Sequence, residues 1–570
     1  MTLHDYLILM IYSVGMLAIG LILSRWNKSA ADMFAVSKQS PWWLSGISSF
    51  MSAFSAGTFV VWGGIAFKHG AVAISILMCL GISSFIVGKT LAGRWAKLGV
   101  TTIGEYINIR FGRSVVQFYT WIGMCLKLVS MSVALYAFAI LFCSLVPLEE
   151  GNFLRDESTG NLSITYACII SGLLMLVYTV SGGLWAVLII DAVQFVILTV
   201  TVLFVVPLSF ASIGGVGNFL DQVPDGFLQI ASGKFTYWFL LGWIVVHTFK
   251  LGGEWVFIQR FLAVKSPKDA RKSAYLLGIL YLVSPVIWML PAMIYRIVDP
   301  NANPEQAYFL ACAAVLPAGM MGLLLASMFS AAASYIDGEI NVYAGAITND
   351  WYKALIRPSA SDVELVTVGR ISTFLIGAII ICGAVAIPYV GGAENVILTI
   401  TSLLVVPMVL PTLWGLLFKK TTQQAVWITT GLSFLAAALV KIFIKENSGN
   451  SFIDWLLENS LVLEASVGIL VPLLTLSLFE LSAKNTALGF IEVQSKSIDY
   501  TVTDTPIAIA EYPARLLAYS IGCLAFIMFI LSIVVDDKQI MIAAFAVVLM
   551  TICMIILWGL RKFKKINKEC

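Results

Sequence analysis

The chain is long, strongly apolar and close to neutral. Of its 570 residues, 59% are hydrophobic and 12% are charged, and the formal net charge is +3. Soluble chains carry about 25% charged residues, so most of this chain is expected to lie in a lipid bilayer. This excludes a soluble globular protein, and we expect no nucleic-acid partner. Eight of the nine cysteines stand singly in apolar segments, which indicates small buried side chains rather than disulfides or metal ligands.

Fifteen apolar segments are long enough to cross a bilayer, which takes about 20 helical residues. In chain order these predicted spans are 5–26, 43–68, 70–95, 117–146, 162–181, 184–211, 237–262, 274–297, 317–349, 365–388, 394–418, 424–444, 460–481, 514–536 and 539–560. The first segment lacks a basic start and a small-residue cleavage site, so it indicates a retained span rather than a signal peptide.

Basic residues follow the odd-numbered spans. Arg25 and Lys28 follow the first span, Arg94 and Lys97 follow the third, and the run RKFKKINK follows the fifteenth. Lys and Arg in short loops favour the cytoplasmic side. We therefore expect the N-terminus outside and the C-terminus in the cytoplasm, which agrees with an odd number of spans.

Two spans contain glycine interruptions five helices apart. The second span holds Ser55, Ala56 and Gly57, and the seventh holds Gly252 and Gly253. Broken helices in corresponding places are typical of inverted-repeat transporters, whose site lies near the bilayer midplane. The alternative is that these glycines only allow helices to pack closely.

The fold prediction is an all-α integral membrane protein of about 15 transmembrane helices, with a five-plus-five inverted-repeat core and discontinuous helices. Residues 1–42 would form an extra N-terminal helix and a cytoplasmic loop. Residues 43–211 and 212–423 would form the two five-helix repeats. Residues 424–570 would form four accessory helices.

The ninth span carries a polar stripe. Its members are Ser327, Ser330, Ser334, Asp337, Asn341, Gly345 and Thr348. They recur at steps of three and four, so they share one helix face. Small residues beside the stripe, such as Gly338, would let another helix approach closely. An aspartate inside a membrane indicates a functional site; the alternative is a packing seam with one ion pair.

Charged residues also occupy the seventh and fourth spans. His247, Lys250 and Glu254 share one face beside the glycine pair, and Lys127 lies centrally in the fourth span. A lysine at that depth pairs with a carboxylate, faces an anionic ligand or is neutral. Two pairings are open, Lys127 with Asp337 and Lys250 with Glu254. Glu339 would line a cavity or contact a neighbouring helix.

Several motifs resemble those of the sodium:solute symporter family. In the ninth span, Ala331, Ser334, Asn341 and 350–352 (DWY) resemble the family pattern AA-x-x-S-[ST]…N-S…D-[IL]-Y, with Tyr335 in place of the second hydroxyl residue. Other resembling segments are PWW at 41–43, residues 102–112, residues 178–194, QR at 259–260 with the following loop, and 415–422. The resemblance covers about residues 1–445.

The resemblance implies alternating access, in which sodium and a small solute bind together between the broken helices. The ion would bind near the carbonyls of Met51, Phe54 and Ala331 and the hydroxyl of Ser334. Asp191 stands at the place of a family aspartate, where it would neutralise a second cation or complete a hydrogen-bond network.

Asp337 leaves two alternatives for the coupling ion. Its carboxylate would strengthen a sodium site, or it would pair with Lys127 so that a proton or the ammonium replaces the ion. We favour Na⁺ as the coupling ion and expect no organic cofactor.

The predicted solute site gathers polar residues from several spans. Its members are Ser55, Thr58, Lys127, His247, Lys250, Glu254, Tyr281 and Thr399. Lys127 and the charged seventh span favour a sugar, a sugar acid or another organic anion.

The predicted function is sodium-coupled uptake of a small polar solute across the bacterial inner membrane by a monomer. The alternatives are a proton-coupled or ion-independent carrier of the same fold, or a transporter-like solute sensor. An enzyme is not expected, because no nucleophile–base pair or phosphate loop stands out and the chain has only three histidines.

Overall fold

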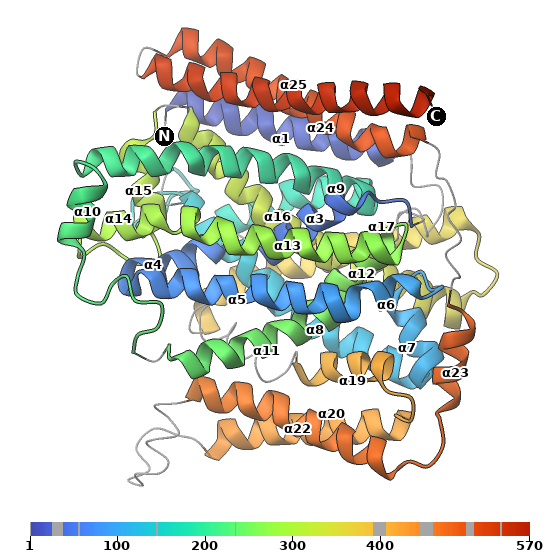
Figure 1. Cartoon of the computed structure of the whole chain (residues 1–570). Coiled ribbons are helices and arrows are strands. Elements are labelled where there is room, and N and C mark those ends of the chain that lie inside the picture. The colour runs from blue at the N-terminus through green and yellow to red at the C-terminus, as the bar shows by residue number, and fades with distance from the viewer. Residues whose placement is uncertain are drawn as a thin grey trace.

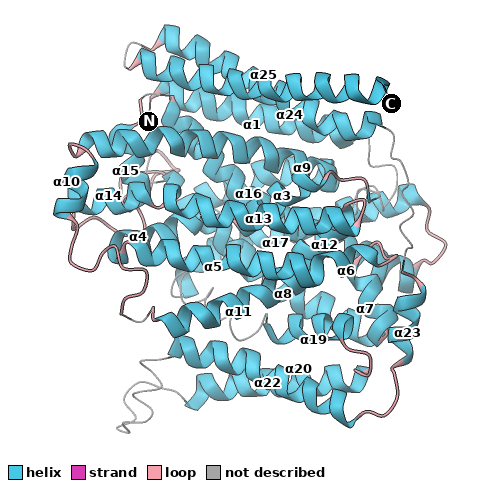
Figure 2. Cartoon of the chain, viewed as in Figure 1, coloured by secondary structure: helices cyan, strands magenta, loops and turns pink. Residues whose placement is uncertain are grey.

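The computed structural model describes residues 2–24, 38–54, 57–143, 146–233, 235–317, 319–390, 406–443, 460–497, 507–535 and 538–569. Throughout these ranges the chain is helical, apart from loops and a few isolated bridges (Figure 2). Two residues assigned to the predicted solute site, Ser55 and Thr399, lie outside the described residues.

The first half of the chain contributes the helices up to Ala263. They are α1 (Leu3–Ser24), α3 (Trp42–Ala53), η2 (Thr58–Trp62), α4 (Gly63–His69), α5 (Ala71–Val87), η3 (Gly88–Ala92), α6 (Gly93–Lys97), α7 (Ile103–Phe111), α8 (Arg113–Cys143), α9 (Ile164–Ser212), α10 (Val216–Gln222), α11 (Tyr237–Gly253) and α12 (Trp255–Ala263). The second half contributes α13 (Pro267–Trp288), α14 (Leu290–Val298), α15 (Ala307–Val315), α16 (Met320–Ala346), η4 (Ile347–Ile356), α17 (Asp362–Ala386), η5 (Ile387–Val390), α19 (Val406–Leu417), α20 (Gln423–Phe443), α22 (Ser460–Ser482), α23 (Leu488–Ser495), α24 (Ile507–Val534) and α25 (Gln539–Glu569).

Ten described helices are long and apolar enough to cross a membrane, and an eleventh span results if the bent pair of α3 with η2 and α4 is counted. The protein is therefore a multi-pass membrane protein, but the count of fifteen is not confirmed. The predicted spans 162–181 and 184–211 fall in one continuous helical run, α9. The seventh span is divided between α11 and α12, and its charged side chains lower its hydropathy. Residues 394–405 of span 394–418 lie outside the described residues.

Helix α16 lies at the centre of the bundle. Every residue of this helix except Tyr335 is buried, and it packs against α1, α3, α8, α9, α12 and α17. Gly322 permits the close approach of α1, because a Cβ there would lie 2.2 Å from the backbone oxygen of Asp5. At Gly338, a Cβ would lie 3.1 Å from Val256 of α12. The predicted close approach beside the polar stripe is therefore confirmed.

Both predicted interruptions are breaks in the helices. Helix α3 ends at Ala53 and is followed by Phe54 in an extended conformation. Helix α11 ends at Gly253, and Glu254 is extended (φ −74°, ψ 134°) before α12 begins. The glycine pair also serves close packing, because a Cβ on Gly252 would lie 2.4 Å from Leu91. The glycine pair therefore both ends a helix and allows close packing, and the inverted repeat stays a prediction.

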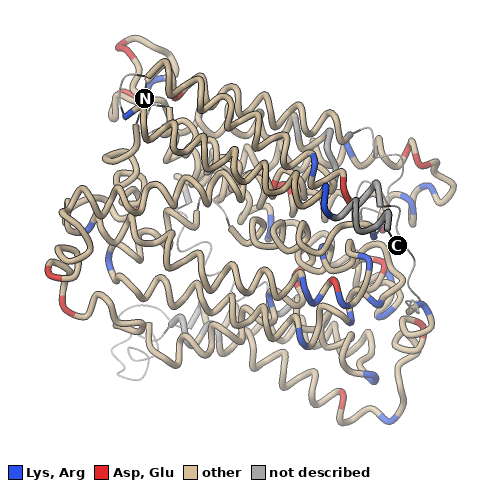
Figure 3. Tube along the Cα trace, turned by 45° about the horizontal axis from the view of Figure 1, so that its top comes forward, with Lys and Arg blue, Asp and Glu red and all other residues tan. Residues whose placement is uncertain are grey.

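The C-terminal helices divide between two sides of the bundle. Helices α20 and α22 pack against α19, whereas α24 and α25 pack against α9 on the side where α1 lies (Figure 1). The two termini lie at opposite ends of the bundle, and most Lys and Arg residues gather at the end that holds the C-terminus (Figure 3). The orientation of these two ends across the membrane stays a prediction.

Candidate functional site

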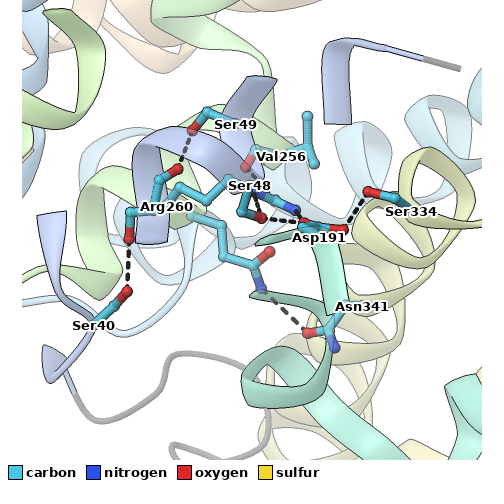
Figure 4. A network of polar contacts seen from close by, with 10 residues as sticks. Ser40, Ser48, Ser49, Asp191, Val256, Arg260, Ser334 and Asn341 are labelled. Atoms are coloured by element: carbon cyan, nitrogen blue, oxygen red, sulfur yellow. Dashed lines mark hydrogen bonds and ion pairs between the residues drawn. The ribbon is translucent and has the colours of Figure 1, made fainter. Parts of the chain in front are cut away.

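Asp191 of α9 stands at the centre of a buried polar network. One carboxylate oxygen accepts a hydrogen bond from the hydroxyl of Ser48 in α3, and the other accepts one from Ser334 in α16 (Figure 4). The carboxylate is fully buried. A buried carboxylate is stable only when it is paired and hydrogen-bonded, so these partners are required by its position.

Arg260 of α12 completes this network. Its Nε donates to Ser48 Oγ at 3.0 Å, and one of its terminal nitrogens lies 4.0 Å from Asp191 (Figure 4). We call Ser48, Asp191, Arg260 and Ser334 the aspartate network. It joins four helices, and it includes α3 and α12, each of which borders a helix break.

The structure brings together two of the predicted ion-binding residues, Asp191 and Ser334. Ala331 lies one turn before Ser334 on the same buried helix. Met51 and Phe54 are buried at the end of α3, where the Met51 carbonyl accepts from the Phe54 amide at 3.1 Å. Hydroxyl, carboxylate and carbonyl oxygens are the donor set that a hard cation such as Na⁺ prefers, so the residues present fit the predicted ion.

Asp337 is not part of the aspartate network. Its carboxylate accepts a hydrogen bond from the hydroxyl of Thr179 in α9. The pairing of Asp337 with Lys127 that was considered from the sequence is wrong, because Lys127 has other partners. The rotation of α8 about its axis decides this, and the sequence pattern does not fix that rotation.

Lys127 forms two buried ion pairs. Its ammonium contacts Glu254 at the break between α11 and α12, and it lies 2.6 Å from Glu339 Oε1 in α16. The pairing of Lys250 with Glu254, which the sequence also left open, is wrong as well, since Glu254 pairs with Lys127. Glu339 therefore contacts a neighbouring helix, α8. It also lines a cavity, and the sequence left these two roles open.

These three side chains line a cavity beside the helix break. Its polar and aromatic walls are Tyr119, Lys127, Glu254, Trp255, Glu339 and Tyr343. The rings of Trp255 and Tyr343 are stacked, with centroids 5.8 Å apart. We call this space the lysine cavity. A second cavity, which includes Thr102 and Gln259 in its lining, shares Trp255 with it.

The remaining predicted solute residues lie elsewhere. Tyr281 is buried against the ring of Phe50, with centroids 4.8 Å apart. Thr58 begins η2 and is buried. His247 is buried against Trp243, and neither ring nitrogen has a hydrogen-bond partner among the described residues. The lining of the lysine cavity includes Lys127 and Glu254 but not these three residues or Lys250.

The sequence interpretation missed two features of this region. Ser48 was not chosen, although Ser45, Ser48 and Ser52 recur at steps of three and four in α3 and indicate a polar face. An aromatic cluster surrounds Tyr281, in which Trp288 contacts Phe50 and Phe54 with ring centroids 5.5 and 4.4 Å apart. Aromatic residues spread over separate spans give no local signal that they meet.

Comparison with known proteins identifies a family. A model described as the sodium:solute symporter family matches residues 34–430. The sodium/glucose cotransporter of Vibrio parahaemolyticus is 28% identical over 480 residues, which cover 77% of this chain and 85% of that protein. The mouse sodium/myo-inositol cotransporter 2 is 26% identical over 481 residues, which cover 74% of this chain and 67% of that protein.

Two solved structures share the fold. A Na⁺-coupled sialic acid symporter in a substrate-bound outward-open state has a TM-score of 0.66 at 18% identity, and the match covers 85% of this chain and all of that one. Mhp1, a nucleobase-cation-symport-1 family transporter, has a TM-score of 0.52 at 12% identity, with 81% and 98% coverage. The family and these relatives are transporters rather than enzymes. With a family model that spans most of its length, this chain belongs to the sodium:solute symporter family.

Proposed function

We propose that this chain couples the inward movement of sodium to the uptake of a small polar solute by alternating access. Membership of the family supports sodium as the coupling ion. The relatives named above, which carry glucose or myo-inositol, support a polyhydroxylated solute. A bacterial relative supports a place in the inner membrane, with the C-terminus at the cytoplasmic, Lys- and Arg-rich end.

The aspartate network is the observation that carries this proposal. It joins the helix before one break, α3, to the central helix α16 through a single carboxylate. A cation that binds beside Asp191 and Ser334 adds positive charge to this junction and stabilises the state in which α3 and α16 are close. Binding of sodium and closure of the solute site would in this way favour each other.

Solute would occupy the space next to the second break. Glu254 lies at that break, and the lysine cavity opens beside it between α8, α12, α16 and α19. A break in the helix places backbone and side-chain polar groups next to a cavity, which is where such breaks occur in membrane transporters. The aromatic walls of Trp255 and Tyr343 would pack against the apolar faces of a sugar ring.

The test uses purified protein in liposomes with glucose, myo-inositol and sialic acid as solutes. An inward sodium gradient and an inward proton gradient are imposed separately. We expect sodium-driven uptake of glucose or myo-inositol, the solutes named for the relatives. Uptake driven by the proton gradient alone would overturn sodium coupling and favour a proton-coupled carrier.

Counterflow of labelled solute separates a carrier from a solute sensor. A carrier exchanges internal unlabelled solute for external labelled solute, whereas a sensor only binds it. Solute binding without counterflow would therefore overturn the transport proposal.

A further inference from the structure

We infer that Glu339 selects the solute, and that the lysine cavity takes a neutral or cationic polyhydroxylated compound and rejects a carboxylate. This inference rests on the proposed function and adds the chemical class of the solute. It narrows the expectation from the sequence, which allowed a sugar, a sugar acid or another organic anion.

The first step is that Lys127 is not available to an anion. Lys127 is 7% exposed, and its ammonium already contacts two carboxylates, those of Glu254 and Glu339. An anion would have to displace one of them and leave a buried carboxylate without its counter-charge. Breaking a buried pair in this way is strongly unfavourable.

The second step is that Glu339 keeps a free acceptor. One oxygen contacts Lys127, while Oε2 is buried and has no hydrogen-bond partner among the described residues. Glu339 is 1% exposed and lines the lysine cavity. A buried carboxylate oxygen without a partner is costly, so a ligand that donates a hydrogen bond to it gains most. A hydroxyl or an ammonium group meets this requirement, and a carboxylate does not.

The third step concerns the other charge nearby. Lys250 lies one helical turn before Glu254, whose amide donates to the Lys250 carbonyl at 2.9 Å. Its ammonium forms no ion pair within the described part of the chain, and Lys250 does not line the cavity. Lys250 therefore does not occupy Glu339 Oε2. A solute carboxylate placed beside that oxygen would meet like charge in a site that excludes water.

The test compares three probes that share a hexose frame: glucose, glucosamine and glucuronate. Their dissociation constants are measured on the full chain in detergent with saturating sodium. We expect glucose or glucosamine to bind at least about tenfold more tightly than glucuronate, the size expected for one charge-assisted hydrogen bond. Glucuronate that binds as tightly as the other two would overturn the inference.

Glu339→Gln tests the assigned residue. This variant keeps the shape, removes the charge and offers an amide donor, so the preference against glucuronate should shrink about tenfold. The control is Glu511→Gln in α24. Glu511 also pairs through one oxygen, with Arg515, while its Oε1 is buried and has no hydrogen-bond partner in the described part of the chain. The control should keep the wild-type preference, and an unchanged preference in a folded Glu339→Gln variant would remove Glu339 from this role.

Sodium-dependent thermal stabilisation, measured in parallel, separates this inference from the proposed function. Sodium stabilisation with no binding of any of the three hexoses would overturn the solute class alone. No stabilisation by sodium in the wild-type chain would count against the proposed function instead.

Discussion

Ser48 and Ser334 meet on a single carboxylate, each donating a hydrogen bond to a different oxygen of Asp191. The two serines belong to α3 and α16, which pack against each other at the centre of the bundle. If α3 moves away from α16 during the transport cycle, at least one of these bonds must break. The hydrogen bonds of the aspartate network therefore differ between conformational states of the protein.

Ser334→Ala is expected to weaken the response to sodium. The variant removes one hydrogen bond to a charged group, which is worth about 1.5–3 kcal/mol, and one oxygen of the proposed ion site. We expect the sodium concentration at half-maximal thermal stabilisation to rise at least about tenfold.

Ser327→Ala is the matched control, because Ser327 lies on the same buried helix but donates to the backbone oxygen of Leu324. Its sodium response should stay at the wild-type value. Equal sodium responses in the two variants would show that the aspartate network stabilises the fold and does not bind sodium.

Lys127→Met is expected to lower the thermal stability of the protein strongly. It leaves the carboxylates of Glu254 and Glu339 buried without a counter-charge, and breaking a buried pair in this way costs about 3–5 kcal/mol. Adding Glu254→Gln to the same chain removes one of those charges and should recover part of the loss. Thermal unfolding of the two single variants and the double variant measures this coupling. Strictly additive losses would show that the two side chains do not interact.

The sequence predicted the central helix and the two breaks because their signals are local. The stripe on α16 recurs at helical spacing, and the break at Glu254 directly follows Gly253. All of the polar side chains of the stripe are buried. Helical periodicity fixes which residues share a face, so this part of the prediction needed no tertiary information.

Contacts between distant helices were not predictable in the same way. Lys127 is separated by 127 residues from Glu254 and by 212 from Glu339. Its partners depend on the rotation and the axial shift of α8, α12 and α16 relative to one another. No local sequence pattern gives these rotations and shifts. The same reason explains why Ser48 and Arg260 were not joined to Asp191 in advance. The predicted boundary between spans 162–181 and 184–211 is absent, because the backbone of α9 stays helical from Ile164 to Ser212.

Asp5→Ala is expected to loosen the contact between α1 and α16. Asp5 Oδ1 accepts hydrogen bonds from the amides of Gly319 and Gly322, at 2.7 and 2.9 Å, at the start of α16. A carboxylate at a helix N-terminus satisfies free amides and compensates the helix dipole, and its loss costs about 1–2 kcal/mol. We expect a lower thermal midpoint for Asp5→Ala. Glu149→Ala, at an exposed acidic position, is the control and should unfold like the wild type.

Single cysteines test the orientation of the chain. Glu157 is exposed in the acidic loop after α8, and Lys268 is exposed near the start of α13 within a basic loop. Basic loops favour the cytoplasmic side, so Glu157→Cys should react with a membrane-impermeant maleimide on intact cells and Lys268→Cys should not. Permeabilised cells are the control for reactivity, and both variants should then label. The wild-type chain measures the background from native cysteines such as Cys125 and Cys382. Labelling of Lys268→Cys alone on intact cells would invert the proposed topology and place the C-terminus outside.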